Sequence, residues 1–218
     1  MLLLIEDNRN ISKAEGKAIV FLLIAGIILW IPVMQFLMGD PPDFLRDLGF
    51  DSGPAGTPLA WILAVVVAVG YSGFTVFNNP LVRTYCCSIT WFKLLAVVIA
   101  IAAAIVEEAF FRRLVMDGVL KAGGGAVVQV LASGLIFGIA HGLLGIVTGK
   151  FYVGLGAMMA TGSLGLLLGI IFIIGDRSLL PVIVAHFLIT ATIQPGIMIA
   201  AFLGEMPPPK HGWWRFWK

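Results

Sequence analysis

Charged side chains stand inside one of the long apolar runs of this sequence. Residues 106–113 read VEEAFFRR and include Glu107, Glu108 and Arg112. Each unpaired charge at the centre of a membrane span costs about 2.5 to 3.5 kcal/mol. Glu108 and Arg112 are four residues apart and therefore share a helix face, so we expect them to pair. Glu107 points to another side and is predicted to be the free acid, unless it reaches the membrane surface or pairs with Arg113.

Two of the three histidines occupy later apolar runs, in the segments FGIAH at 137–141 and HFLIT at 186–190. Taken singly, His141 or His186 is explained as well by packing as by catalysis. Glu107 and the two histidines lie on three different runs, however, and ionisable groups on three spans can meet only inside a helix bundle. We therefore predict one polar cluster of these three side chains.

Hydrolysis is the chemistry that such a cluster suits. A buried carboxylate can take a proton from water, and an imidazole can orient that water or return the proton to a leaving amine. Ser133, two turns before His141, is the alternative nucleophile, but no Gly-x-Ser-x-Gly elbow surrounds it, so water is the better one. Glu107, His141 and His186 could instead bind Zn²⁺ with one open position, although the His-Glu-x-x-His helix typical of zinc sites is missing.

The composition indicates that membrane-spanning helices position this cluster. Of the 218 residues, 60% are hydrophobic and 12% are charged, and the mean hydropathy is +1.02, which is outside the range of soluble domains. Apolar runs long enough to cross a bilayer fall at 18–38, 59–77, 94–115, 126–147, 151–174 and 179–203. We predict the all-α class, a polytopic transmembrane helix bundle of about six to seven spans with the polar site inside the bundle. A seventh span would require Pro195-Gly196 to split the last run.

Glycines recur every four residues in two of these runs. Gly134, Gly138 and Gly142 do so in the fourth run, and Gly165 and Gly169 in the fifth. Small residues at this spacing let helices approach one another closely. The pattern predicts a packed bundle that could enclose a hydrated cavity.

The charge pattern bears on partners and orientation. A net charge of +2, dispersed over the loops, excludes a nucleic-acid surface. Arg9, Lys13 and Lys17 precede the first run, whereas the loop after it carries Arg46 among four aspartates, which predicts a cytoplasmic N-terminus. With six spans the basic, tryptophan-rich tail also lies inside, next to membrane lipids. We expect an integral, multi-pass protein, of the plasma membrane in a prokaryote.

Three motifs follow one another on successive runs, namely EExxxR from residue 107, FxxxH from residue 137 and HxxxT from residue 186. In this order they resemble the CAAX-processing and bacteriocin-processing (CPBP, or Abi) family of intramembrane proteases, which includes the type II CAAX prenyl endopeptidases. The resemblance covers 94–203, the expected catalytic core. Residues 1–93 form a two-span region without a matching motif, and 204–218 a basic aromatic tail. The family implies a structural role for Glu108 and Arg112.

The resemblance also implies roles for the polar cluster. Glu107 would be the general base, His141 would hold the attacking water, and His186 with Thr190 would stabilise the oxyanion. The family's last motif usually ends in Asn or Asp, and the hydroxyl of Thr190 offers one donor in place of an amide's two. Gln194, one turn further along nearly the same face, is predicted to supply the missing amide.

The function implied is that of an intramembrane endopeptidase, hydrolysing a peptide bond in a membrane-associated, possibly prenylated CAAX-type or bacteriocin-type peptide. Its expected partners are a peptide or lipidated protein substrate and membrane lipids, and the one cofactor considered is Zn²⁺. Thr190 leaves open a non-catalytic immunity or scaffold protein of the same fold. A proton-coupled transporter is a further alternative, because intramembrane Glu and His also build proton relays, although the sequence has no internal repeat.

Overall fold

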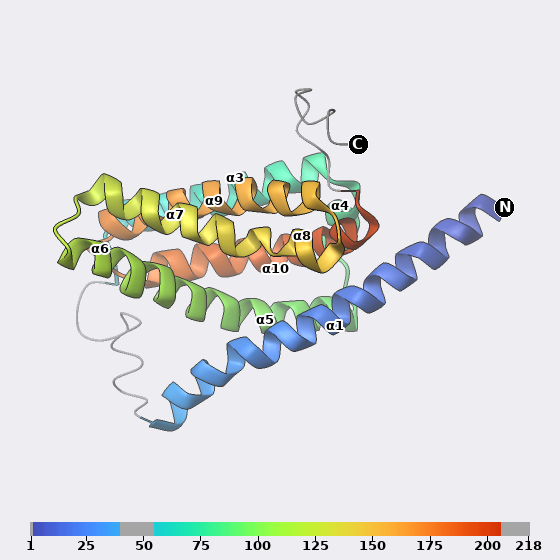
Figure 1. Cartoon of the computed structure of the whole chain (residues 1–218), viewed down its shortest axis with the longest axis horizontal. Helices are drawn as coiled ribbons and strands as arrows, with labels where there is room; N and C mark the ends of the chain where they lie inside the picture. Colours follow the sequence, from blue (N-terminus) through green and yellow to red (C-terminus); the bar gives the residue numbers. More distant parts are fainter. Residues whose placement is uncertain (1, 40–54, 206–218) are drawn as a thin grey trace.

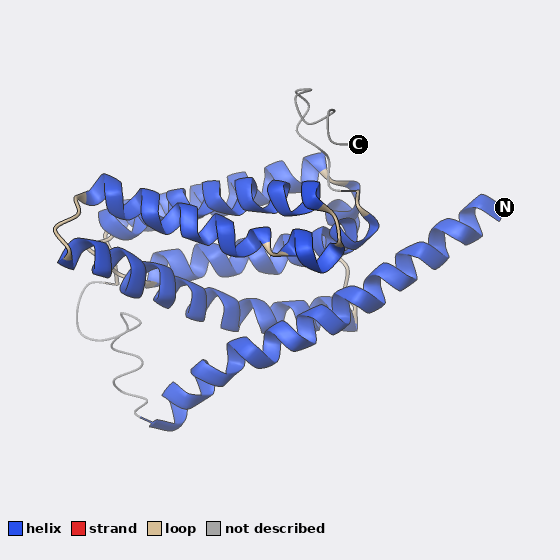
Figure 2. Cartoon of the chain, in the orientation of Figure 1, coloured by secondary structure: helices blue, strands red, loops and turns tan. Residues whose placement is uncertain are grey.

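A computed structural model of the protein describes residues 2–39 and 55–205, and every regular element within them is helical (Figure 2). In chain order these are α1 (Leu2–Gly39), α3 (Pro58–Asn78), α4 (Pro80–Cys86), α5 (Trp91–Glu108), η1 (Ala109–Met116), α6 (Asp117–Lys121), α7 (Ala126–Gly142), α8 (Leu144–Thr148), α9 (Phe151–Ile174) and α10 (Leu180–Leu203). The loop that contains Arg46 and the tail from residue 206 onward lie outside the described residues.

Six helical stretches of the described chain are long and apolar enough to cross a membrane: Asn10–Gly39, Pro58–Asn78, Trp91–Lys121, Ala126–Thr148, Phe151–Ile174 and Leu180–Leu203. The predicted all-α, polytopic bundle is therefore confirmed. Pro195 lies inside α10, which continues through it to Leu203. The sequence had left open a split at this proline, and the structure has one continuous last span instead.

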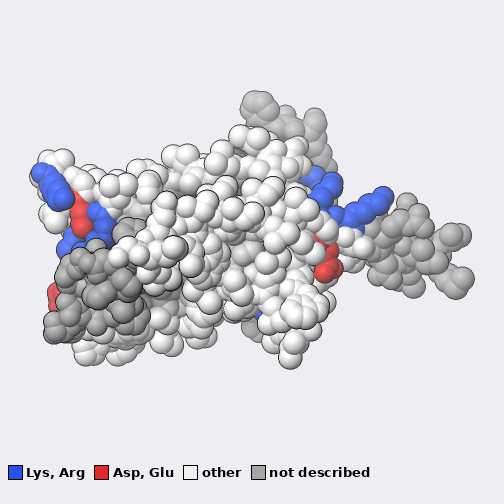
Figure 3. All heavy atoms as spheres, turned by 90° about the horizontal axis from the view of Figure 1, so that it is seen from below, with Lys and Arg blue, Asp and Glu red and all other residues white. Residues whose placement is uncertain are grey.

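Charged side chains gather near the two ends of the bundle. On the face drawn in Figure 3, Lys, Arg, Asp and Glu appear mostly near the two ends of the long axis, and the middle is almost free of them. Many large apolar side chains are exposed along the helices, including Ile27, Val69 and Leu135. An apolar belt between two charged ends fits a bilayer, in which lipid covers the exposed apolar surface. The protein is an integral membrane protein.

Helix α1 lies obliquely across the outside of the bundle (Figure 1). It contacts α5 and α10, and it buries Ala14, Ala18 and Leu22 in a cluster that also contains Phe92 and Ile199. The helix begins at Leu2, well before the apolar run that starts at residue 18. The basic residues that precede the run are thus part of one long helix rather than of a separate segment.

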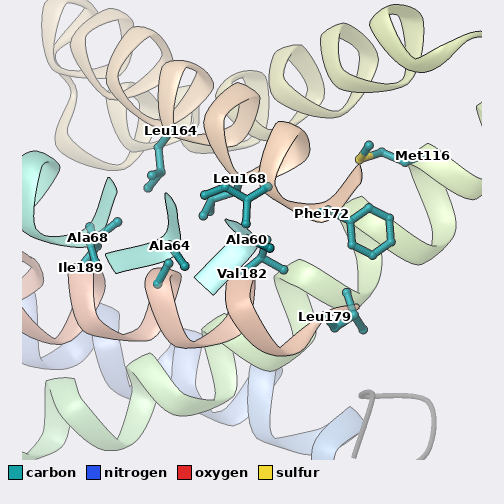
Figure 4. Packing of buried hydrophobic residues seen from close by; sticks show 12 residues of the cluster. Ala60, Ala64, Ala68, Met116, Leu164, Leu168, Phe172, Leu179, Val182 and Ile189 are labelled. Atoms are coloured by element: carbon teal, nitrogen blue, oxygen red, sulfur yellow. The ribbon is translucent and has the colours of Figure 1, made fainter. Parts of the chain in front are cut away.

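The main core lies where α3, α9 and α10 meet (Figure 4). Ala60, Ala64 and Ala68 form a stripe of small residues along α3 and are almost fully buried. The stripe packs against larger side chains of α9 and α10, among them Leu164, Leu168, Phe172, Val182 and Ile189. Small residues on one side and large ones on the other let the helices pack closely, and this packing helps to fix α10, which carries His186.

Glycines bring α7 and α9 into backbone contact, as the sequence predicted. A Cβ added at Gly138 would lie 2.6 Å from the carbonyl oxygen of Met158, and one at Gly165 would lie 3.1 Å from Cα of Gly134. Gly142, in contrast, would bring its added Cβ no closer than 3.7 Å to any neighbour. Close approach therefore depends on some glycines of the repeat and not on all of them.

The substitution Gly138→Ala is expected to destabilise the bundle by about 1 to 3 kcal/mol, because backbone atoms of α9 must move to admit the methyl group. The thermal unfolding midpoint of the detergent-purified protein measures this effect. Gly142→Ala, one turn along the same helix, is the matched control and should change the midpoint little. Equal midpoints for the two variants would contradict the close α7–α9 contact.

Candidate active site

Glu107 and the two intramembrane histidines converge, as predicted. Glu107 is the penultimate residue of α5, His141 the penultimate residue of α7, and His186 lies in the second turn of α10. Oε2 of Glu107 is 3.8 Å from Nε2 of His141 and 3.8 Å from Nε2 of His186. Arg113, the alternative partner of Glu107, lies 3.9 Å from Asp117 instead.

Hydrogen bonds on the far side of each ring fix which nitrogen of the neutral histidine carries the proton. Nδ1 of His141 is 2.9 Å from the carbonyl oxygen of Phe137, which can only accept, so Nδ1–H is the donor. Nδ1 of His186 is 2.8 Å from Oε1 of Glu108, and an ionised carboxylate likewise only accepts. In their neutral forms both rings therefore present an Nε2 lone pair towards Glu107.

With both rings neutral, three acceptors face one another at the centre of the site. Oε2 of Glu107 is buried and has no hydrogen-bond partner among the described residues. A carboxylate oxygen and two imidazole lone pairs repel one another unless something positive or proton-bearing lies between them. A water molecule, which offers two O–H donors, satisfies two of the three at once.

The ring of Phe137 holds both histidines from one side. Its centroid is 4.6 Å from that of His141 and 5.7 Å from that of His186, and the residue is only 1% exposed. The FxxxH motif is explained by these contacts, because the same phenylalanine also supplies the carbonyl that accepts Nδ1–H of His141. Packing and hydrogen bonding together restrict each ring to one orientation.

Glu108 and Arg112 form the predicted pair, 2.7 Å apart and fully buried. Nη1 of Arg112 also donates to Oγ of Ser133 at 2.5 Å and to the carbonyl of Gly165 at 3.2 Å. Because Glu108 accepts from His186 as well, this network joins α5, η1, α7, α9 and α10. The pair ties together the helices that carry the site.

Ser133 does not face the histidines as a nucleophile would. It is fully buried on α7, where its hydroxyl accepts from Arg112 and lies 3.3 Å from the carbonyl of Phe111, to which it donates. The hydroxyl therefore already has a donor, Arg112, and an acceptor, the carbonyl of Phe111. Its place in the structure supports the choice of water over serine.

A cavity of about 510 Å³ adjoins the two histidines. The residues that line it include His141, His186, Thr190 and Gln194. The last three, which were predicted to share one face of the last span, therefore do line one cavity. Glu107 is not among the lining residues and approaches the histidines from beside the cavity. The arrangement places an acid behind two imidazoles, with room for a peptide in front of them.

Comparison with known proteins adds an independent observation. Residues 89–192 match the family model described as type II CAAX prenyl endopeptidase Rce1-like. This segment belongs to the type II CAAX prenyl endopeptidase family. No curated protein and no solved structure matches the chain. The match confirms the resemblance inferred from the three motifs, and it assigns the matched segment, just under half of the chain, to a protease family.

One wall of the cavity lies outside the segment that matches the endopeptidase family. Helix α3 contributes Tyr71, Thr75 and Asn78, which follow one another along a single helix face. Sequence reasoning missed this wall because residues 1–93 carry no family motif. The signal was three polar residues at helical spacing in an otherwise apolar run, and it could have been found.

The turn that connects Glu108 to Arg112 was also not predicted. Ala109–Met116 is a π-helix, in which each turn is wider than in an α-helix. Such segments occur often at functional sites, and this one begins directly after Glu108 and contains Arg112. Nothing in the residue pattern of the endopeptidase motif distinguishes it from an α-helix.

The alternative of a zinc site was tested against the same geometry. One carboxylate and two imidazoles are suitable donors for Zn²⁺. Within 2–39 and 55–205, however, no group of three or more His, Cys, Asp or Glu side chains is arranged so that it could hold an ion. The residues as they stand do not fit a metal, so no step below is assigned to one.

Proposed function

We propose that the protein is an intramembrane endopeptidase that hydrolyses a peptide bond of a membrane-associated CAAX-type substrate. The observation that carries the proposal is the convergence of Glu107 Oε2 with Nε2 of His141 and His186, at 3.8 Å each, beside a cavity inside a membrane bundle. The match of residues 89–192 to CAAX prenyl endopeptidases supports it. A prenylated substrate follows from the family rather than from the geometry.

Water activated by Glu107 is the proposed nucleophile. One O–H of the water donates to Glu107 and the other to Nε2 of His141, and the oxygen attacks the scissile carbonyl as Glu107 takes the proton. The carbonyl oxygen becomes an oxyanion. When the C–N bond breaks, the carboxyl of Glu107 returns the proton to the leaving amine, so that water is added across the bond and the base is regenerated.

The oxyanion requires donors, and α10 is the helix that we propose supplies them. In the neutral ring Nε2 of His186 offers only a lone pair, so His186 can donate only as the imidazolium, a form that the carboxylate of Glu108 at 2.8 Å stabilises. Thr190 and Gln194 follow one and two turns later and line the same cavity. We propose that the amide of Gln194 replaces the donor that Thr190 lacks.

Gln194→Ala is expected to lower kcat by about 100-fold, the lower end of what the loss of one oxyanion donor costs, with little change in KM. Steady-state rates over a range of peptide concentrations separate the two constants. Thr192→Ala is the matched control, because its hydroxyl bonds to the carbonyl of Leu188 within the same helix and it does not line the cavity. If Gln194→Ala kept the full rate while Thr190→Ala reduced it, the amide of Gln194 would have no part in catalysis.

The proposed function is tested by incubating the detergent-purified protein with a panel of prenylated and unmodified CAAX-type peptides, with and without a zinc chelator. We expect cleavage of at least the prenylated peptides and the same rate in the chelator. Loss of activity in the chelator would assign the water to a metal instead of to Glu107 alone. A folded protein that bound the peptides without cleaving them would favour the second candidate, a non-catalytic immunity or scaffold protein, to which Thr190 points.

We further propose that both termini face the cytoplasm. The support is the cluster of Arg9, Lys13 and Lys17 near the start of α1 and the even number of spans among residues 2–39 and 55–205. We also propose that residues 94–203 form the catalytic core, with α3 completing the wall of its cavity.

A further inference from the structure

Helix α10 contains a backbone carbonyl that its own helix cannot satisfy. Pro195 lies inside α10 and has no N–H, so the carbonyl of Ala191, four residues earlier, lacks its intrahelical donor. In a bilayer such a group must find its partner within the protein, because lipid offers none. This carbonyl lies between Thr190 and Gln194, two polar residues that line the cavity.

The side chain of Lys93 reaches this carbonyl from another span. Nζ of Lys93, in the first turn of α5, is 2.5 Å from the carbonyl oxygen of Ala191 and 3.4 Å from that of Thr192. Among the described residues its ammonium has no carboxylate within ion-pair distance. A charge within a membrane span is costly, and here two carbonyls next to the proline stabilise it by accepting hydrogen bonds from the ammonium.

The helix on the other side of the proline is fixed independently. Gly196 packs so closely on the backbone of Val82 in α4 that an added Cβ would collide with it. The interruption in α10 is therefore held after the proline by α4 and before the proline by Lys93 of α5. The turn that carries Thr190 and Gln194 is therefore next to a support on each side of the proline.

We infer that the ammonium of Lys93 replaces the amide donor missing at Pro195, and that Lys93 is thereby a positioning residue that holds the Thr190–Gln194 turn towards the cavity. The inference adds a residue on another helix to the proposed reaction. Its effect on catalysis rests on the proposed function, whereas its effect on the shape of α10 does not.

A double-mutant cycle between Lys93→Met and Pro195→Ala tests the inference. Methionine keeps most of the length of lysine and removes the donor. In the natural background Lys93→Met should lower kcat by about 10-fold and leave KM nearly unchanged, in keeping with the loss of a hydrogen bond from a charged group. In the Pro195→Ala background residue 195 has an N–H for the Ala191 carbonyl, and Lys93→Met should change kcat by less than about twofold.

Backbone amide exchange provides a readout that does not depend on cleavage. Lys93→Met should speed exchange in residues 190–199, Lys93→Arg should restore slow exchange, and the effect should vanish in the Pro195→Ala background. Lys121→Met, at the opposite end of the same span, is the matched control and should leave exchange in this segment unchanged. If the natural protein cleaves no peptide, the proposed function fails and exchange still decides the role of Lys93.

Two outcomes would overturn the inference. The first is an effect of Lys93→Met on exchange that is as large with alanine at 195 as with proline, which would mean that the lysine does not serve the proline gap. The second is faster exchange with an unchanged kcat in a protein that cleaves peptides, which would mean that the bond stabilises α10 without positioning the turn for catalysis.

Discussion

Glu107→Gln is expected to reduce kcat by about 100-fold to 10,000-fold, the range that general acid–base catalysis contributes, with little change in KM. Glutamine has nearly the same shape as glutamate but cannot take a proton from water. Its amide would also donate to the Nε2 lone pair of His141, which lies 3.8 Å from the present carboxylate. The substitution therefore removes the base and occupies one of the acceptors that would otherwise hold the water.

Initial rates at several peptide concentrations measure this loss, together with the unfolding midpoint of the variant. Because Oε2 of Glu107 has no hydrogen-bond partner among the described residues, we expect the midpoint to stay the same or rise. Glu205→Gln, which changes an exposed carboxylate just after α10, is the control and should have no effect on rate. A Glu107→Gln variant with the natural kcat would show that the histidines activate water without the acid.

The largest expected effect on stability is that of Arg112→Met, about 3 to 5 kcal/mol, because it leaves the charge of Glu108 buried without its partner. Arg112 and Glu108 are both fully buried, and Arg112 also holds Ser133 and the carbonyl of Gly165. Reversible unfolding in mixed detergent micelles, monitored by circular dichroism, measures the change in the free energy of unfolding.

Arg113→Met is the matched control for this prediction. Arg113 is the next residue, its side chain is 43% exposed, and its nearest carboxylate oxygen, on Asp117, is 3.9 Å away. Exposed pairs of this kind contribute about 1 kcal/mol or less, so the control should remain close to the natural stability. Equal losses for the two arginines would contradict the role assigned to the buried pair.

Much of this architecture could be predicted from the sequence because the bilayer imposes simple rules. The thickness of the hydrocarbon core sets the length of each apolar run, and all six runs became spans. The pairing of Glu108 with Arg112 followed from their spacing on one helix. The meeting of Glu107, His141 and His186 followed from the cost of leaving three ionisable groups in lipid.

What could not be predicted depends on contacts between residues far apart in the chain. Glu108 was expected to pair with Arg112 alone, yet Oε1 of its carboxylate also accepts a hydrogen bond from His186, 78 residues away. Pro195 was considered a place where the last run might split. The helix continues through it, and the ammonium that donates to the carbonyl left free by the proline belongs to Lys93 on another span. Local spacing and propensity carry no information about either contact.

The carboxylate of Glu108 accepts hydrogen bonds both from an arginine that joins helices and from a histidine of the site. A mutational scan that records both protein abundance and activity should therefore separate two classes of inactive variants. Changes at Glu108 or Arg112 reduce the amount of protein in the membrane along with the activity. Changes at Glu107 leave abundance intact, so inactive protein that still accumulates identifies residues that act on the substrate.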